Sequence, residues 1–169
     1  MRFNRPDYGA PPKKKRLKWL LLAGGVLLIL FLSWRTFRHP PLEGLDGPWP
    51  VERVVDGDTL VVELDGESTR VRLIGVDTPE SVHPDQSKNT PEGEAAAEYA
   101  AGLLEGEKVY LEYDLNRMDQ YGRTLAYVYL EDGTMVQELL LEEGYAQPDP
   151  VKPNTKYAQR FELLAQMAS

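Results

Sequence analysis

Alternating runs of apolar and turn residues predict five β-strands in the chain after residue 49. The runs are rich in Val, Leu, Ile and Tyr, as strands usually are, and they cover residues 51–55, 60–64, 71–76, 108–113 and 123–130. Asp56-Gly57-Asp58 separates the first two runs, and Asp65-Gly66 is a typical hairpin turn between the second and third. Five short strands of this kind fit a closed or partly closed barrel.

Three further segments have helical patterns. Residues 94–104 are Ala-rich and are followed by Gly106, a residue that commonly ends helices. Residues 135–143 form a short amphipathic segment that stops at Gly144, and residues 155–168 place Phe161 on a candidate inner face. The polar residues 81–93 and the Pro-containing residues 147–154 are expected to be loops. Residues 50–169 are therefore expected to form one α+β domain, a five-stranded β-barrel with three helices.

The first part of the chain predicts a membrane anchor. Residues 19–34 carry no charge and are bracketed by Trp19 and Trp34, as is common for segments at membrane interfaces. We expect a basic disordered tail in residues 1–18, a transmembrane helix in residues 19–35 and a Pro/Gly-rich linker in residues 36–49. The basic flank predicts a cytoplasmic N-terminus and an extracytoplasmic domain at the cell membrane. The alternative is a secreted protein with a cleaved signal peptide, although no small-x-small cleavage site follows the apolar run.

Composition limits the chemistry that the domain can perform. The chain has no Cys and only two His, which excludes disulfides, thiolate nucleophiles and His- or Cys-rich zinc sites. A metal would have to be held by oxygen, which favours a hard cation such as Ca²⁺ or Mg²⁺. Residues 35–169 carry 12 basic and 26 acidic residues, so the domain is strongly acidic. This charge argues against avid, sequence-independent binding of nucleic acid.

Carboxylates gather where the predicted strands end, at Asp56, Asp58, Asp77 and Glu80. Asp58 and Asp77, with a backbone carbonyl and waters, would suffice to bind Ca²⁺. Asp58 alone is more typical of an ordinary turn, whereas the set of Asp58, Asp77, Thr78 and Glu80 favours a functional site.

Other charged and aromatic residues are candidates for binding a substrate. Arg72 and Arg123 are candidate phosphate ligands, although either could make a surface salt bridge or lie on an exposed strand face. Tyr121 is a candidate for stacking on substrate, whereas His83 is expected to be a surface residue.

Three motifs, VVDGDTLVV, RLIGVDTPE and QYGRTLAYVYL, closely resemble the staphylococcal nuclease (thermonuclease-like) family over residues 51–159. The resemblance implies an OB-fold barrel with three helices. It also implies Ca²⁺-dependent hydrolysis of DNA and RNA, single-stranded or denatured, to 3′-phosphate products. By position in these motifs and in the later KPN motif, the implied metal ligands are Asp58, Asp77 and the Thr78 carbonyl. The implied catalytic residues are Arg72, Glu80 as general base on water, and Arg123. Tyr121 and Lys152 are the implied substrate-binding residues.

The sequence departs from the family pattern near the KPN motif, where Asp149 stands in place of a tyrosine. The leading hypothesis is a membrane-anchored Ca²⁺-dependent endonuclease that needs no obligate protein partner. The alternative is a catalytically weak or inactive nuclease-like module that binds nucleic acid or a protein partner. Such modules typically lose the Asp and Arg positions, and this chain keeps them, which favours the enzyme.

Overall fold

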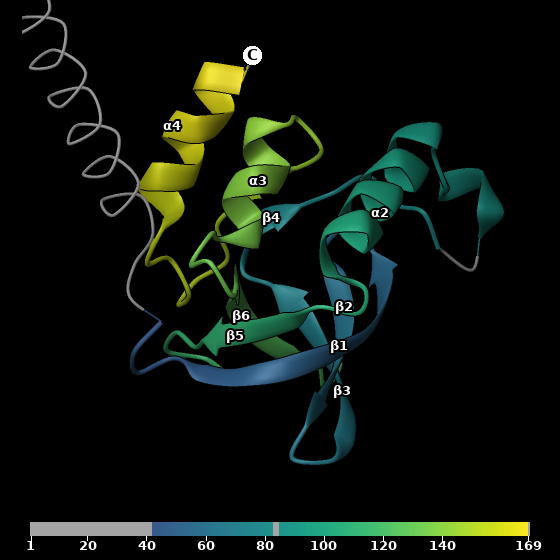
Figure 1. The fold of residues 1–169 in the computed structure, drawn as a ribbon. Coiled ribbons are helices and arrows are strands. Elements are labelled where there is room, and N and C mark those ends of the chain that lie inside the picture. Colours follow the sequence, from purple (N-terminus) through teal and green to yellow (C-terminus); the bar gives the residue numbers. More distant parts are fainter. Residues whose placement is uncertain (1–41, 83–84, 169) are drawn as a thin grey trace, which may run out of the picture. The chain divides into compact units, whose positions relative to one another are not determined.

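Five strands close into a barrel in the order β1-β2-β3-β6-β5 (Figure 1). The structure is a computed structural model that describes residues 42–82 and 85–168. The barrel strands are β1 (Asp46–Asp56), β2 (Thr59–Leu64), β3 (Glu67–Leu73), β5 (Lys108–Glu112) and β6 (Thr124–Leu130). Every neighbouring pair is antiparallel except β3 and β6, which run parallel with Val71 opposite Thr124. The predicted α+β fold with a five-stranded barrel is confirmed.

The barrel core consists of the apolar side chains that alternate along these strands, as expected for a sheet with one buried face. Leu60, Val62, Val71 and Leu73 on β2 and β3 are at most 2 % exposed. β5 and β6 complete the interior with Val109, Leu111, Ala126 and Val128. The barrel is therefore a filled core, and a ligand site must lie at its rim.

The predicted third strand, residues 71–76, is wrong in one respect, because the chain leaves the barrel partway along it. β3 ends at Leu73, and residues Gly75–Asp77 form a separate short strand, β4. Gly75 has a φ of 81°, a conformation that favours glycine, and a Cβ there would lie 3.0 Å from the Phe161 ring. β4 pairs with β7 (Gln147–Asp149), which corrects the expectation that residues 147–149 are a loop.

β1 also differs from its prediction, because it begins at Asp46 inside the segment expected to be linker. Trp49 pairs with Val109 and Asp46 with Leu111, with an irregularity between them that accommodates Pro48, which has no N–H to donate. The Trp49 indole N–H also donates to Asp46 at 3.1 Å. Residues 46–49 therefore belong to the barrel and not to a linker.

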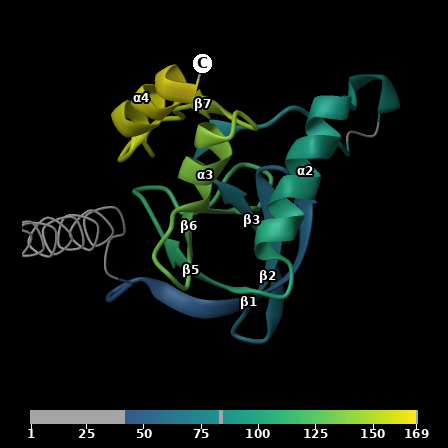
Figure 2. The same ribbon diagram turned by 45° about the horizontal axis from the view of Figure 1, so that its top comes forward.

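Three α-helices lie on the described part of the chain, as predicted: α2 (Pro91–Leu104), α3 (Val136–Glu142) and α4 (Ala158–Ala168). α2 packs against β1 along one side of the barrel, and α3 and α4 pack on each other (Figure 2). α2 begins earlier than expected because Thr90 caps it and Pro91 occupies its first turn, which suits a residue without an N–H. Residues Gln86–Lys88 form a 3₁₀ turn, η1, in the preceding polar loop.

A partly buried polar network links the residues just before α4 to the barrel. Glu112 on β5 accepts hydrogen bonds from the Tyr129 hydroxyl at 2.6 Å and the Tyr157 hydroxyl at 3.0 Å, and it forms an ion pair with Lys156. Phe161, one turn after Tyr157, is 1 % exposed and packs in the core, as the helical pattern predicted.

The predicted tail (1–18), the predicted anchor (19–35), His83 and residues 36–41 of the predicted linker lie outside the described residues. Among the helices that the structure describes, none combines the length and the hydropathy needed to cross a bilayer.

Candidate active site

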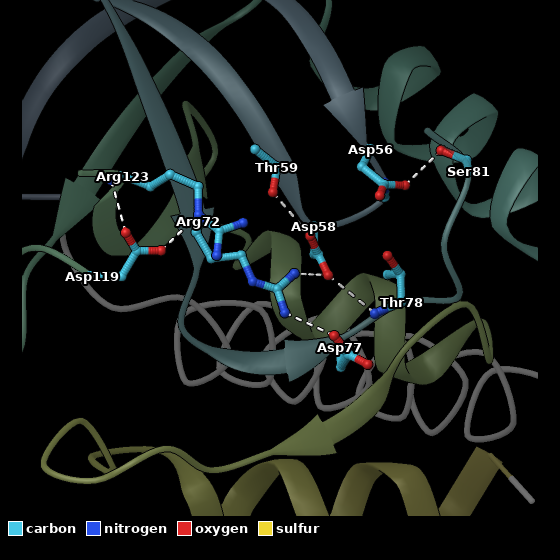
Figure 3. Close-up of polar contacts among 10 residues, drawn as sticks. Asp56, Asp58, Thr59, Arg72, Asp77, Thr78, Ser81, Asp119 and Arg123 are labelled. Atoms are coloured by element: carbon cyan, nitrogen blue, oxygen red, sulfur yellow. Dashed lines mark hydrogen bonds and ion pairs between the residues drawn. The ribbon is translucent and has the colours of Figure 1, made fainter. Parts of the chain in front are cut away.

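Arg72 lies between two carboxylates at the rim of the barrel (Figure 3). Its Nη1 forms an ion pair with Asp58 Oδ2, and its Nη2 is 2.8 Å from Asp77 Oδ1. The Asp58 side chain is only 7 % exposed, whereas that of Asp77 is 62 % exposed. One guanidinium thus joins a buried and an accessible carboxylate.

Strand register explains how these three side chains meet. Thr59 on β2 is opposite Arg72 on β3, and the Leu73 N–H donates to the Asp58 carbonyl at 2.9 Å. Asp58 therefore stands at the turn that begins β2, next to Arg72. Asp77 reaches the same place from β4, because the chain turns at Gly75.

Thr78 is fixed beside Asp58 by its backbone. Its N–H donates to Asp58 Oδ2 at 3.2 Å, and Thr59 Oγ1 donates to the other oxygen of the same carboxylate at 3.0 Å. The Thr78 hydroxyl is packed under Gly57, where a Cβ would lie 2.7 Å from Oγ1. The glycine of the Asp-Gly-Asp turn is therefore needed for close packing.

The donor set at this point fits a hard cation. Asp58 and Asp77 already share one positive charge, that of Arg72, and both offer oxygen ligands. Buried Thr78 Oγ1 has no hydrogen-bond partner among the described residues. In the described ranges, no group of three or more His, Cys, Asp or Glu side chains could hold a metal. The protein side chains would therefore fill only part of a Ca²⁺ shell.

A pocket of about 380 Å³ adjoins the carboxylate pair. Four of the predicted site residues line it together, namely Arg72, Tyr121, Arg123 and Lys152. Arg72 is common to the carboxylate pair and the pocket, because it contacts the carboxylates and also lines the pocket. Asp149 on β7 is a further lining residue, and no described residue forms a hydrogen bond or ion pair with its carboxylate.

Asp119 holds Arg123 in the wall of this pocket. Its Oδ2 accepts the Arg123 Nε–H at 2.6 Å, and its Oδ1 accepts the backbone N–H groups of Tyr121 and Arg123, both at 2.9 Å. Burial alone would raise the pKa of Asp119, but these hydrogen bonds bring the pKa below its ordinary value. The contacts use Nε, and in the described part of the chain neither terminal nitrogen of Arg123 has a protein acceptor.

Tyr121 projects from the same loop. Its side chain is 76 % exposed, and its ring centre lies 5.6 Å from the Arg123 guanidinium carbon. The sequence analysis identified Tyr121 and Arg123 but not Asp119. The available signal was its spacing, because an Asp four residues before an Arg in a loop with Gly can accept hydrogen bonds from both the backbone and the guanidinium.

Glu80 lies three residues after Asp77, in the segment that leads toward η1 and α2. It is half-buried, and its carbonyl accepts the Thr90 N–H at 3.0 Å. The lining of the pocket does not include Glu80. The structure therefore brings Arg72, Asp58, Asp77 and Thr78 together. Arg72 and Arg123 line the same pocket. Glu80 follows this group closely along the chain but does not line the pocket.

Asp56, a member of the acidic cluster in the sequence, binds the segment that contains Glu80 through the next residue, Ser81. It is 9 % exposed, and its Oδ1 accepts the Gly57 N–H at 2.9 Å and the Ser81 hydroxyl at 2.6 Å. Figure 3 shows Asp56 directed at Ser81 and away from Arg72.

Comparisons with known proteins show which family the chain is similar to. The family model described as Staphylococcal nuclease homologue matches residues 70–169. The chain is 38 % identical to the thermonuclease of Staphylococcus hyicus over 160 residues, which cover 92 % of this chain and 94 % of that protein. It is 49 % identical to the thermonuclease of Staphylococcus intermedius over 141 residues, which cover 82 % and 83 % of the two chains. Endonuclease YncB of Bacillus subtilis is 45 % identical over 120 residues, 70 % of this chain and 56 % of that protein.

The chain belongs to the staphylococcal nuclease family. The predicted enzyme class, a nuclease that hydrolyses phosphodiester bonds, is confirmed by the family model together with these relatives.

Proposed function

We propose that this nuclease requires Ca²⁺ and hydrolyses single-stranded or denatured DNA and RNA to 3′-phosphate products. The observation that carries the proposal is the position of Arg72. Its guanidinium contacts Asp58 and Asp77 and also lines the pocket that contains Arg123. A site for a cation and a site for a phosphate therefore share a border, which is what hydrolysis of an anionic ester needs.

Asp58, Asp77 and the Thr78 carbonyl are the ligands that would hold Ca²⁺. When bound, the ion withdraws charge from a phosphoryl oxygen and so stabilises the extra negative charge of the transition state. Asp58 is oriented for this task by Thr59 and by the Thr78 N–H, so its carboxylate needs little rearrangement.

Arg72 and Arg123 bind the phosphate. A guanidinium presents several N–H donors in a plane that matches two phosphate oxygens, and such charged hydrogen bonds are stronger than neutral ones. The terminal nitrogens of Arg123 have no protein acceptor in the described residues, so they can donate to substrate while Nε stays on Asp119. Arg72 can turn from the carboxylates to the phosphate when another cation neutralises Asp58 and Asp77.

Glu80 acts as the general base. It takes a proton from water while the water oxygen bonds to phosphorus, and the P–O5′ bond breaks to leave a 3′-phosphate. The departing oxygen takes up a proton and becomes a 5′-hydroxyl. Glu80 lies three residues after Asp77 and on a segment fixed by Asp56 and Thr90, which supports this assignment.

Tyr121 and Lys152 contact the nucleotide beside the scissile phosphate. Tyr121 offers an exposed ring for stacking, and Lys152 offers a positive charge in the same pocket. A base can stack on the exposed Tyr121 ring only when it has left its own base pair, which favours single-stranded or denatured substrates.

The proposed location is the outer face of the cell membrane, with residues 19–35 as anchor and the N-terminus in the cytoplasm. The support is the uncharged, Trp-bracketed segment and the seven basic residues in positions 1–18. Protease added to intact cells should release the nuclease domain. Resistance of the domain until the cells are lysed would contradict this orientation, and domain found free in the medium would favour secretion.

Hydrolysis of a single-stranded oligonucleotide tests the activity. With the full chain in detergent, cleavage should require Ca²⁺, stop with chelator and give 3′-phosphate ends. Arg72→Ala and Glu80→Ala should each lower kcat/KM at least about 100-fold, as loss of transition-state donors or of a base does. Wild-type rates in both variants would contradict the mechanism, and no cleavage with any divalent ion would indicate a binding module.

A further inference from the structure

The first turn of α2 is packed directly against the peptide group of Glu80. An ideal Cβ on Gly93 would lie 2.2 Å from the Glu80 carbonyl oxygen, 2.5 Å from its carbonyl carbon and 2.8 Å from the Pro79 oxygen. These atoms are backbone, so they cannot move aside as the end of a flexible side chain can. Only glycine allows the helix and the Glu80 peptide to approach this closely.

The helix that makes this contact is well fixed at its start. Thr90 caps α2, and its Oγ1 accepts the Gly93 N–H at 3.0 Å. The Thr90 N–H in turn donates to the Glu80 carbonyl at 3.0 Å. Glu80 is thus held by one hydrogen bond from the cap and by a close packing contact from Gly93, both on the same helical turn.

The residues on either side of Glu80 are fixed from the opposite direction. The Ser81 hydroxyl donates to buried Asp56 at 2.6 Å, and the Thr78 N–H donates to buried Asp58 at 3.2 Å. Asp56 is the last residue of β1, and Asp58 lies in the turn that leads to β2. The segment from Thr78 to Ser81 is therefore clamped between that turn and α2.

We propose that Gly93 is a positioning residue for Glu80, because its missing side chain sets where the Glu80 backbone lies relative to the phosphate site. The inference rests on the proposed role of Glu80 as general base. Real Cβ contacts are essentially never shorter than 3.0 Å, so a methyl group at position 93 must push the Glu80 peptide or the helix by roughly 1 Å. A misplacement of about 1 Å can cost about 100-fold in rate.

Gly102 provides a matched control in the same helix. It is exposed, and a Cβ there meets nothing within 4 Å. Gly93→Ala and Gly102→Ala add the same methyl group to α2 and raise its helix propensity in the same sense. Only the methyl group at position 93 would meet the Glu80 backbone.

The test measures hydrolysis of a single-stranded oligonucleotide by the full chain in Ca²⁺, with Ca²⁺ affinity measured separately by calorimetry. Gly93→Ala should lower kcat about 10- to 100-fold, leaving KM and Ca²⁺ affinity within twofold of wild type. Gly102→Ala should leave kcat unchanged. In a Glu80→Ala background, Gly93→Ala should cause no further loss, because the group that it displaces is gone.

A milder variant covers the case in which Gly93→Ala does not fold. Ser81→Ala removes the 2.6 Å hydrogen bond to Asp56 without adding an atom. It should lower kcat severalfold, and again only when Glu80 is present. A Gly93→Ala enzyme with the kcat of Gly102→Ala would overturn the inference, as would losses of equal size with and without Glu80. Both results leave the nuclease activity intact, whereas an inactive wild type would overturn the proposed function as well.

Discussion

Asp119 binds the Nε–H of Arg123 at 2.6 Å and, with its other oxygen, the backbone N–H of the same residue at 2.9 Å. Asp119→Asn keeps one oxygen for the backbone but places an amide against the guanidinium. We expect the loop to persist and Arg123 to lose its orientation, with kcat/KM lowered about 10-fold and little change in melting temperature.

The measurement is steady-state hydrolysis together with thermal unfolding followed by circular dichroism. Asp132→Asn is the control, because Asp132 also accepts a backbone N–H, that of Thr134 at 2.9 Å, in a turn outside the pocket lining. Equal kcat/KM in the two variants would show that Asp119 does not orient Arg123.

Arg72 forms ion pairs with both Asp58 and Asp77, so the Ca²⁺ ion that we propose at these carboxylates would compete with it. Arg72→Gln should lower stability in chelator by about 1–3 kcal/mol, because the mostly buried Asp58 loses its charged partner. When Ca²⁺ is added, the melting temperature of the same variant should rise more than that of wild type. Ligand binding to the folded state stabilises it, and in the variant Ca²⁺ no longer competes with Arg72. Differential scanning fluorimetry with and without Ca²⁺ measures both effects.

Arg70→Gln is the matched control for this experiment, because Arg70 is exposed and lies two residues earlier on β3. Its Ca²⁺-dependent gain should equal that of wild type. A gain in Arg72→Gln no larger than in the control would contradict the competition.

Glu112 makes stability depend on pH. Burial alone would raise its pKa, but hydrogen bonds from Lys156, Tyr129 and Tyr157 bring the pKa below 4.5, its ordinary value. Its contribution is therefore fully present above about pH 4.5 and is lost as pH falls through the lower folded pKa. Urea unfolding between pH 3 and 7 should show this loss, and Glu112→Gln should reduce it. Glu52→Gln, an exposed change on β1, is the control for the removal of a carboxylate.

Tyr129 limits stability at the alkaline end. Burial, followed by its hydrogen bonds to Glu112 and Tyr157, raises its pKa above the ordinary 10.0, so the folded protein keeps the hydroxyl protonated. The contribution is complete below pH 10 and declines above it, where the unfolded chain ionises first. Tyr129→Phe should therefore unfold with a weaker alkaline dependence than wild type in urea titrations at pH 9 to 11.

Asp149 places a negative charge in the wall of the pocket that Arg72 and Arg123 also line, where we propose that the substrate phosphate binds. Asp149→Asn should lower KM for a single-stranded oligonucleotide about two- to fivefold at low ionic strength, because one repulsive charge is removed near the phosphates. Added salt should shrink the difference. Asp65→Asn makes the same charge change at the β2–β3 hairpin tip and should not alter KM. A KM that is equal in both variants would show that Asp149 does not affect binding.

The barrel could be predicted because its strands carry strong local signals. Apolar runs and Asp-Gly turns mark β2 and β3, and the alternation in residues 108–113 marks β5. β4 and β7 could not be predicted, because each has three residues and exists only through pairing with the other. Their separation from the barrel depends on Phe161, which arrives from α4 to pack against Gly75.

The motifs indicate candidate site residues, but they do not indicate the residues that hold those candidates in place. Arg72 and Arg123 stand in recognisable motifs, while Asp119 looks like any acidic loop residue until the loop folds back on Arg123. Gly93 lies in a segment that the sequence predicted to be loop, and its contact with Glu80 spans a polar stretch without periodicity. Contacts of this kind arise from tertiary packing and leave no local pattern.

The parallel pairing of β3 and β6 has a consequence for when the pocket forms during folding. Val71 lies opposite Thr124. Arg72, which follows Val71, and Arg123, which precedes Thr124, therefore come together only after a loop of about fifty residues has closed. Pairing over such a sequence separation is slow and is completed late in folding. A chain whose β6 has not yet left the ribosome therefore lacks the pocket that Arg72 and Arg123 line together.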